Sequence, residues 1–130
     1  MRKKEKEPEW FWARGLHDAE VEDISIKEIN PDYSKTLPLY NFLSIKLDAE
    51  EAMFERDITE IRFYNYKLKG IETKLPTEYP LFWMTETLSQ FSKNVFEIKI
   101  ELETADGKPR FIHMTFQSAE VIRKQNAQRR

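Results

Sequence analysis

The chain has 130 residues, a formal net charge of −2 and no cysteine; 40% of its residues are hydrophobic and 34% are charged. This composition is typical of one globular domain with a strongly charged surface. The lack of cysteine excludes disulfides, thiolate nucleophiles and cysteine-ligated metals. No stretch approaches the roughly 20 apolar residues that span a bilayer. From Arg14 to Ile61 there are 12 acidic and 5 basic residues, which disfavours nucleic acid and is compatible with a basic protein as partner. Ordinary solubilising surface charge is the simpler explanation.

In chain order, residues 1–9 are mostly charged and are predicted to form a disordered tail. The basic start lacks the apolar run of a signal peptide, so we expect a cytoplasmic protein. Residues 10–130 are predicted to form a single β-rich domain. This domain begins with Trp10-Phe11-Trp12, whose rings we expect to plug the interior of the sheet.

A first strand is predicted over residues 20–29, where the step from Val21 to Ile24 interrupts the alternation of apolar and polar residues. An interruption of this kind is typical of a β-bulge. A second strand is predicted over residues 41–48, which alternate cleanly. Asp48 is then expected to be the N-cap of one helical turn.

A third strand is predicted over residues 58–68, where aromatic and basic residues are interleaved as on some base-stacking sheets. The acidic flanks and the absence of a complete RNA-binding motif favour cross-strand packing instead. Residues 81–88 fit a fourth strand, with Leu81, Trp83 and Thr85 on one face.

Residues 96–103 alternate apolar and charged residues without interruption, and Asp106-Gly107 is a strong hairpin signal before a return strand over residues 110–116. Ser118 is expected to cap a short basic helix that ends the chain. The predicted fold is mainly β, with α+β as the alternative. It is a single antiparallel meander of about five or six strands, curled into an open sheet or half-barrel.

His17-Asp18 is the first candidate for chemistry, because a carboxylate beside an imidazole can orient a general base or help to bind a metal. Neighbours on a strand point to opposite faces, however, so their adjacency in sequence does not imply contact. The alternative is structural: Asp18 caps the turn into the first strand through backbone N–H groups, and His17 packs under Trp10 or Trp12.

His113 is the only other histidine, and it alternates with the apolar residues of its strand. A metal site would need both histidines to meet beside a carboxylate such as Glu20 or Asp23. Trp83 is either core material or part of an exposed interaction patch. The candidate binding residues are Trp12, His17, Asp18, Trp83 and His113; no residue is assigned as catalytic or as a metal ligand, and no cofactor is expected.

The segment Leu16-His17-Asp18-Ala19-Glu20-Val21, followed later by Ile61-Arg62-Phe63-Tyr64-Asn65, resembles a recurring bacterial pattern. In this pattern a tryptophan precedes a strand led by His-Asp-Ala, and a strand containing Phe and Asn follows. The chain is similar in this respect to small uncharacterised bacterial β-meander families, which include predicted immunity proteins of toxin systems. The resemblance implies a single-domain binding protein without enzymatic activity.

The predicted function is therefore that of a non-enzymatic module that binds another protein, with an immunity or inhibitor role as the more specific form. The alternative is a metal-dependent or His-Asp-dependent hydrolase, or a small-ligand binder, centred on His17 and Asp18 with His113. This alternative requires the three side chains to converge in one pocket. The sequence predicts no particular oligomeric state.

Overall fold

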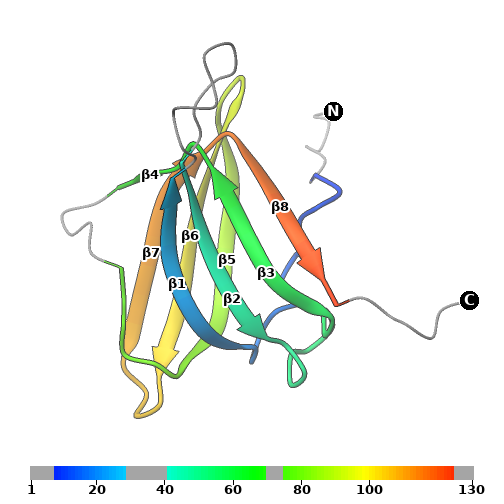
Figure 1. The fold of residues 1–130 in the computed structure, drawn as a ribbon, viewed down its shortest axis with the longest axis vertical. Coiled ribbons are helices and arrows are strands. Elements are labelled where there is room, and N and C mark those ends of the chain that lie inside the picture. Colours follow the sequence, from blue (N-terminus) through cyan, green and yellow to red (C-terminus); the bar gives the residue numbers. More distant parts are fainter. Residues whose placement is uncertain (1–7, 29–40, 70–74, 125–130) are drawn as a thin grey trace, which may run out of the picture.

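The computed structural model describes residues 8–28, 41–69 and 75–124, which form one eight-stranded antiparallel sheet (Figure 1). Its strands are β1 (Glu20–Glu28), β2 (Asn41–Asp48), β3 (Ile58–Tyr64), β4 (Lys67–Leu68), β5 (Leu81–Ser92), β6 (Val95–Thr104), β7 (Pro109–Phe116) and β8 (Ser118–Arg123). Their order across the sheet is β4-β7-β6-β5-β1-β2-β3-β8. Two meanders, β1–β2–β3 and β5–β6–β7, are thus joined where β1 pairs with β5.

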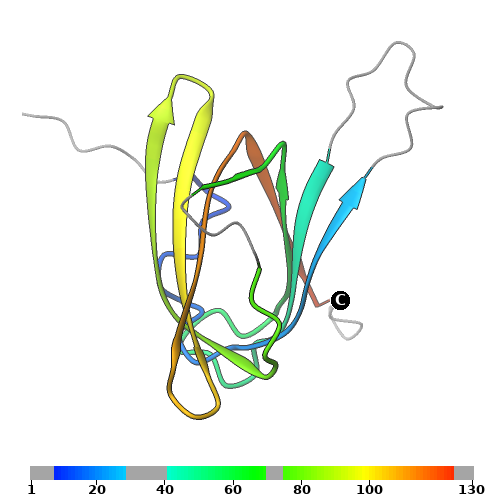
Figure 2. The ribbon, with the colours of Figure 1, turned by 90° about the vertical axis from the view of Figure 1, so that its left-hand side faces the viewer.

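The sheet is curled (Figure 1), and it is open because its end strands β4 and β8 do not pair with each other. Figure 2 shows the β5–β6 hairpin and the β1–β2 pair diverging at one end of the molecule. β7 and β8 lie near opposite ends of the sheet order, but only Gln117 separates them in the sequence. The Gln117 N–H donates to the Tyr64 carbonyl at 3.0 Å. The predicted mainly β, antiparallel and open architecture is confirmed. The prediction of a single meander of about five or six strands is wrong, because there are eight strands and β1 pairs with β5, β4 with β7 and β8 with β3.

The predicted C-terminal helix is wrong over the residues that the structure describes. Residues 118–123 form β8, which pairs with β3. Alternate side chains of β8, Ala119 and Val121, pack against the core. A segment this short gains little from helix propensity alone, whereas the open edge of β3 supplies backbone partners along its length. Residues 125–130, where the predicted helix would end, lie outside the described part of the chain, as do residues 1–7 of the predicted tail.

The helical turn predicted after Asp48 is also absent, although its capping bond forms: the Glu50 N–H donates to Asp48 Oδ1 at 3.1 Å. The backbone N–H groups of residues 53–55 donate to carbonyls of the segment before β1 and not to carbonyls of their own turn. Tertiary hydrogen bonds have replaced the helical ones. No helix able to cross a membrane is found among the described residues.

The bulge predicted between Val21 and Ile24 is confirmed, since β1 shifts register against β2 between Val21 and Asp23. The predicted strand over residues 81–88 is confirmed as part of β5. The predicted hairpin at Asp106-Gly107 is present as well, with Gly107 at φ 89°. This positive φ is open to glycine at little energetic cost.

The core lies on the concave side of the curl, where the aromatic residues before β1 fill the interior. Trp10 packs on Phe96 and Phe116, with ring centroids 5.8 and 5.9 Å away. Trp12 packs edge-on against Trp83, with ring centroids 5.6 Å apart. Figure 1 shows this segment (blue) running from the upper right of the molecule to its lower end, where β1 starts. The N-terminal segment therefore acts as a plug and brings its own backbone close to β5.

Candidate binding site

The segment between the aromatic plug and β1 has an unusual backbone. Three of its non-glycine residues have positive φ angles: Ala13 (45°), Arg14 (68°) and Asp18 (78°). A positive φ is unfavourable for residues that have a Cβ, and it persists only where the surrounding structure imposes it. Here the Asp18 N–H donates to the Trp83 carbonyl at 2.8 Å, and the Trp83 N–H donates to the Ala19 carbonyl at 2.8 Å. Clusters of such residues occur preferentially at functional sites.

The loop after β2 is attached to this segment by three backbone hydrogen bonds. The Met53 N–H donates to the His17 carbonyl at 2.9 Å, and the N–H groups of Phe54 and Glu55 donate to the Gly15 carbonyl at 3.0 and 2.9 Å. A Cβ on Gly15 would overlap the side chain of Glu55 and lie 2.9 Å from the Trp12 carbonyl oxygen, so the contact between the loop and this segment requires glycine. The Phe54 side chain nevertheless stays 74% exposed and that of Met53 48% exposed. An aromatic side chain is thus presented to solvent on a fixed backbone.

A bulge in β5 places a carboxylate beside this loop. β5 shifts register against β6 between Trp83 and Thr85. Leu81 and Trp83 face the core before the bulge, whereas Glu86 is the buried residue after it and pairs with Ile100 of the core. The bulge therefore reverses which residues of β5 face inward. Thr85, which the sequence placed on the face of Trp83, is exposed.

Glu86 is only 8% exposed, and both of its carboxylate oxygens accept hydrogen bonds from N–H groups. The Trp83 indole Nε1–H donates to Oε1 at 2.8 Å, and the Arg14 backbone N–H donates to Oε2 at 2.8 Å. Across residues 8–28, 41–69 and 75–124, no lysine, arginine or histidine side chain forms an ion pair with Glu86. The charge of this buried carboxylate is thus balanced by N–H dipoles and not by a cation.

Glu86 belongs to the wall of a pocket of about 530 Å³, which we call the Glu86 pocket. Its lining residues come from the segment before β1, from the loop after β2 and from β5: Phe11, Ala13, Arg14, Met53, Phe54, Glu86, Thr87 and Leu88. The volume lies within the range of small-ligand pockets. Its walls combine apolar side chains, two of them aromatic, with three polar residues: Arg14, Thr87 and the buried acid Glu86.

Four of the five predicted binding residues gather beside this pocket. Trp12 and Trp83 are buried behind it, and the Trp12 indole N–H has no hydrogen-bond partner among the described residues. The His17 Nδ1–H donates to the Met84 carbonyl at 2.7 Å, at the β5 bulge, and His17 Nε2 lies 3.5 Å from Asp18 Oδ1. His17 and Asp18 are thus close to each other, and the hydrogen bond of the imidazole holds the bulge.

His113 is placed elsewhere, on β7, where its Nε2 lies 2.5 Å from Glu97 Oε2 of β6. The hydrogen bond from His113 and the nearby charge of Lys69 lower the pKa of Glu97. The imidazoles of His17 and His113 thus have separate partners, the Met84 carbonyl and Glu97. The part of the chain that the structure describes holds no group of three or more histidine, aspartate or glutamate side chains placed to bind a metal.

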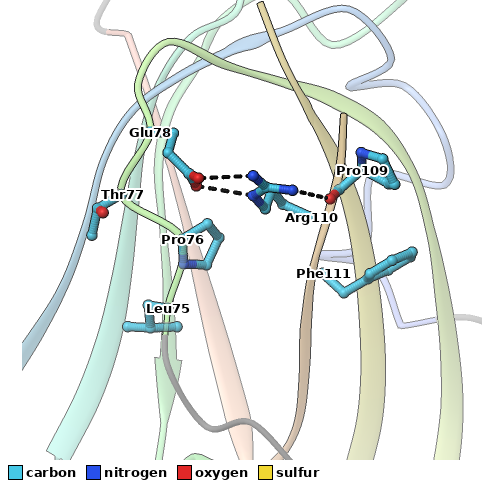
Figure 3. A pocket seen from close by; sticks show the side chains of 7 residues that line it. All are labelled: Leu75, Pro76, Thr77, Glu78, Pro109, Arg110 and Phe111. Atoms are coloured by element: carbon cyan, nitrogen blue, oxygen red, sulfur yellow. Dashed lines mark hydrogen bonds and ion pairs between the residues drawn. The ribbon is translucent and has the colours of Figure 1, made fainter. Parts of the chain in front are cut away.

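A second pocket, of about 540 Å³, lies between residues 75–78 and the start of β7 (Figure 3). Arg110 donates to Glu78 through Nε at 3.0 Å and through one terminal nitrogen at 2.8 Å. The hydrogen bonds from Arg110 also lower the pKa of Glu78. The acid and the base of this pocket therefore satisfy each other, unlike the acid of the Glu86 pocket.

Sequence reasoning missed Glu86, Met53 and Phe54. Glu86 has the spacing of a solvent-facing strand residue unless the bulge is known, and nothing in the sequence of β5 indicates that bulge. Phe54 is a single aromatic residue in an acidic loop, which is a weak signal for exposure that could have been noticed.

Comparison of the chain with protein family models, with curated proteins and with solved structures gave no match. The function is therefore inferred from the geometry of the site.

Proposed function

We propose that this protein is a non-enzymatic binding module that docks another protein through the surface around the Glu86 pocket. The observation that carries the proposal is the exposure of Phe54, at 74%, on a backbone held by hydrogen bonds to Gly15. Exposed aromatic residues of this kind are frequent hot spots of protein interfaces. A fixed backbone favours binding because little conformational entropy remains to be lost.

The charge around Phe54 favours a basic partner. Asp18, Asp48 and Glu51 are exposed acidic residues of the two segments that present Phe54. A positively charged partner would be steered towards this side and held in register there. A cytoplasmic inhibitor or immunity role, as the sequence resemblance implies, would use the same surface to cover the basic face of a target protein.

The proposal is tested by affinity capture from a lysate of the source cell with three forms of the immobilised protein. Wild type is compared with Phe54→Asp and with the matched control Phe91→Asp, since Phe91 is exposed at 55% near the end of β5 and not in the loop that carries Phe54. We expect one protein to be retained by wild type and by Phe91→Asp and to be lost with Phe54→Asp. Equal retention by all three forms would contradict the proposal.

A further inference from the structure

We infer that the Glu86 pocket receives an arginine side chain of the partner protein. This inference rests on the proposed function and adds the chemistry of the contact to it. The first support is the charge of Glu86: a buried carboxylate is unfavourable unless it is paired, and no cationic side chain among the described residues forms an ion pair with it.

The second support is the remaining hydrogen-bonding capacity of the carboxylate. An ionised carboxylate offers about four acceptor sites. The described donors, the Trp83 indole and the Arg14 backbone N–H, use one on each oxygen. Each oxygen thus keeps an acceptor position, and a guanidinium can donate to both oxygens of one carboxylate at once.

The third support is the composition of the walls. Phe11 and Phe54 contribute aromatic rings, and Met53 and Leu88 contribute aliphatic surface. A guanidinium is planar and weakly hydrated, and it stacks favourably on aromatic faces while its edge pairs with an acid. An arginine side chain matches a buried acid that lies beside aromatic and aliphatic side chains.

Arg14 modulates the site through its side chain. Its backbone N–H binds Glu86, but its side chain is exposed at the rim of the pocket. A positive charge at the rim opposes the approach of a second cation. Arg14→Asn removes this charge, keeps the backbone N–H and suits the positive φ of 68° at this position, so it should strengthen binding.

The experiment is an NMR titration of the whole protein with N-acetyl-arginine amide, followed at the indole N–H signal of Trp83, which donates to Glu86. N-acetyl-citrulline amide, which has nearly the same shape but no charge, is the control ligand. We expect a saturable shift with the arginine probe, a smaller one or none with citrulline, and tighter binding to Arg14→Asn. No saturable shift with the arginine probe, or equal shifts with both probes, would overturn the inference.

Two variants locate the binding. Glu86→Gln should weaken binding of the arginine probe by at least about tenfold, because the charge-assisted pair is lost. Should this variant fail to fold, Phe54→Ala takes its place and should weaken binding about twofold to fivefold through the lost cation–π contact. Phe91→Ala, on the solvent-facing part of β5, should leave the affinity unchanged. Equal affinities of Phe54→Ala and Phe91→Ala would overturn the inference.

Failure of this inference can be told apart from failure of the proposed function. Loss of the captured protein with Phe54→Asp, together with no response to the arginine probe, leaves the binding module standing and removes the arginine contact. Saturable probe binding, together with capture that is insensitive to Phe54→Asp, overturns the docking proposal and with it the assignment to a partner's side chain.

Discussion

The half-buried Glu60 and the buried Glu86 lie on opposite faces of the sheet, and only Glu60 is paired with a cationic side chain of the described residues. Glu60, on β3, accepts hydrogen bonds from Ser44 Oγ at 2.6 Å and from Arg62 Nε at 3.0 Å. Burial raises its pKa, but the hydrogen bonds from Arg62 and Ser44 outweigh burial, and the pKa of Glu60 is lowered. Glu86, on the concave face, has N–H dipoles but no cation among the described residues.

This difference in pairing separates a glutamate that stabilises the fold, Glu60, from one that we assign to binding, Glu86. The Glu60 network is complete, because a neighbouring strand and the same strand supply its hydroxyl and its cation. The Glu86 pocket is completed only by a cation from outside the described residues. A charge that the protein buries without a cation is unfavourable for folding alone, so its presence favours a binding role.

The exposed phenylalanines show the same contrast. Lys69 lies over the ring of Phe91 at 4.7 Å, and Lys99 lies over the ring of Phe111 at 5.1 Å. No lysine or arginine of residues 8–28, 41–69 or 75–124 is placed in this way over Phe54. The ring of Phe54 is therefore available to a cation of the partner.

The largest expected effect comes from removing Glu86, with removal of Glu60 as the comparison. Glu86→Ala leaves the Trp83 indole N–H and the Arg14 N–H without an acceptor, and we expect a loss of about 3 kcal/mol in the free energy of unfolding. Glu60→Ala leaves one buried group, the Ser44 hydroxyl, without its acceptor, whereas Arg62 is partly exposed to solvent; the loss should be smaller, about 1 kcal/mol. Urea unfolding of both variants measures the difference. Equal losses would show that the two sites are not distinct.

The fixed backbone around Phe54 is tested by Gly15→Ala. A Cβ at this position would overlap the Glu55 side chain of the loop and lie 2.9 Å from the Trp12 carbonyl oxygen, and the resulting displacement should lower the free energy of unfolding by about 2 kcal/mol. Gly107→Ala is the control, because nothing lies within 4 Å of its Cβ and only the positive φ opposes it, by about 1 kcal/mol. A Gly15→Ala protein as stable as wild type would contradict the tight contact between the loop and the N-terminal segment.

The Glu60 network should make stability depend on pH. Because its pKa in the folded state is below the ordinary value of 4.5, Glu60 contributes stability that is complete above that value and is lost as the pH falls through the folded-state pKa. We expect the urea midpoint to fall less between about pH 7 and about pH 4 in Glu60→Gln than in wild type. The exposed Glu51→Gln serves as a charge-matched control, and an unchanged acid sensitivity in Glu60→Gln would refute this expectation.

The smallest expected effects concern the exposed rings. Phe54→Ala should change the free energy of unfolding by less than about 0.5 kcal/mol, as is usual at an exposed position. Phe91→Ala loses its contact with Lys69 and should be less stable by about 0.5–1 kcal/mol. Urea unfolding at low ionic strength compares the two, and a larger loss for Phe54→Ala would indicate a packing role that its exposure does not suggest.

Much of the sheet can be predicted from the sequence, because alternation is strong in β2 and β6 and the Asp106-Gly107 turn sets the register of its hairpin. The strand β8 could not be predicted in this way, since its pairing depends on the free edge of β3 and not on its own composition. The pairing of β8 with β3 joins residues that are far apart in the sequence, so no local sequence pattern predicts it.

The candidate site could be predicted only in part. The unusual residues before β1 drew attention to His17 and Asp18, which lie beside the Glu86 pocket. The inward direction of Glu86 depends on a bulge held by His17 and Asp18, more than 60 residues away in sequence. Interactions of such long range are absent from any window of the sequence.

The most direct test of the claim that the Glu86 pocket holds a partner's arginine is competition on the captured complex. Immobilised wild-type protein carrying its captured partner is washed with N-acetyl-arginine amide at a saturating concentration, or with the same concentration of N-acetyl-citrulline amide. We predict that the arginine probe releases the partner and that the citrulline probe does not. Retention of the partner with both probes, or equal release by both, would contradict the claim.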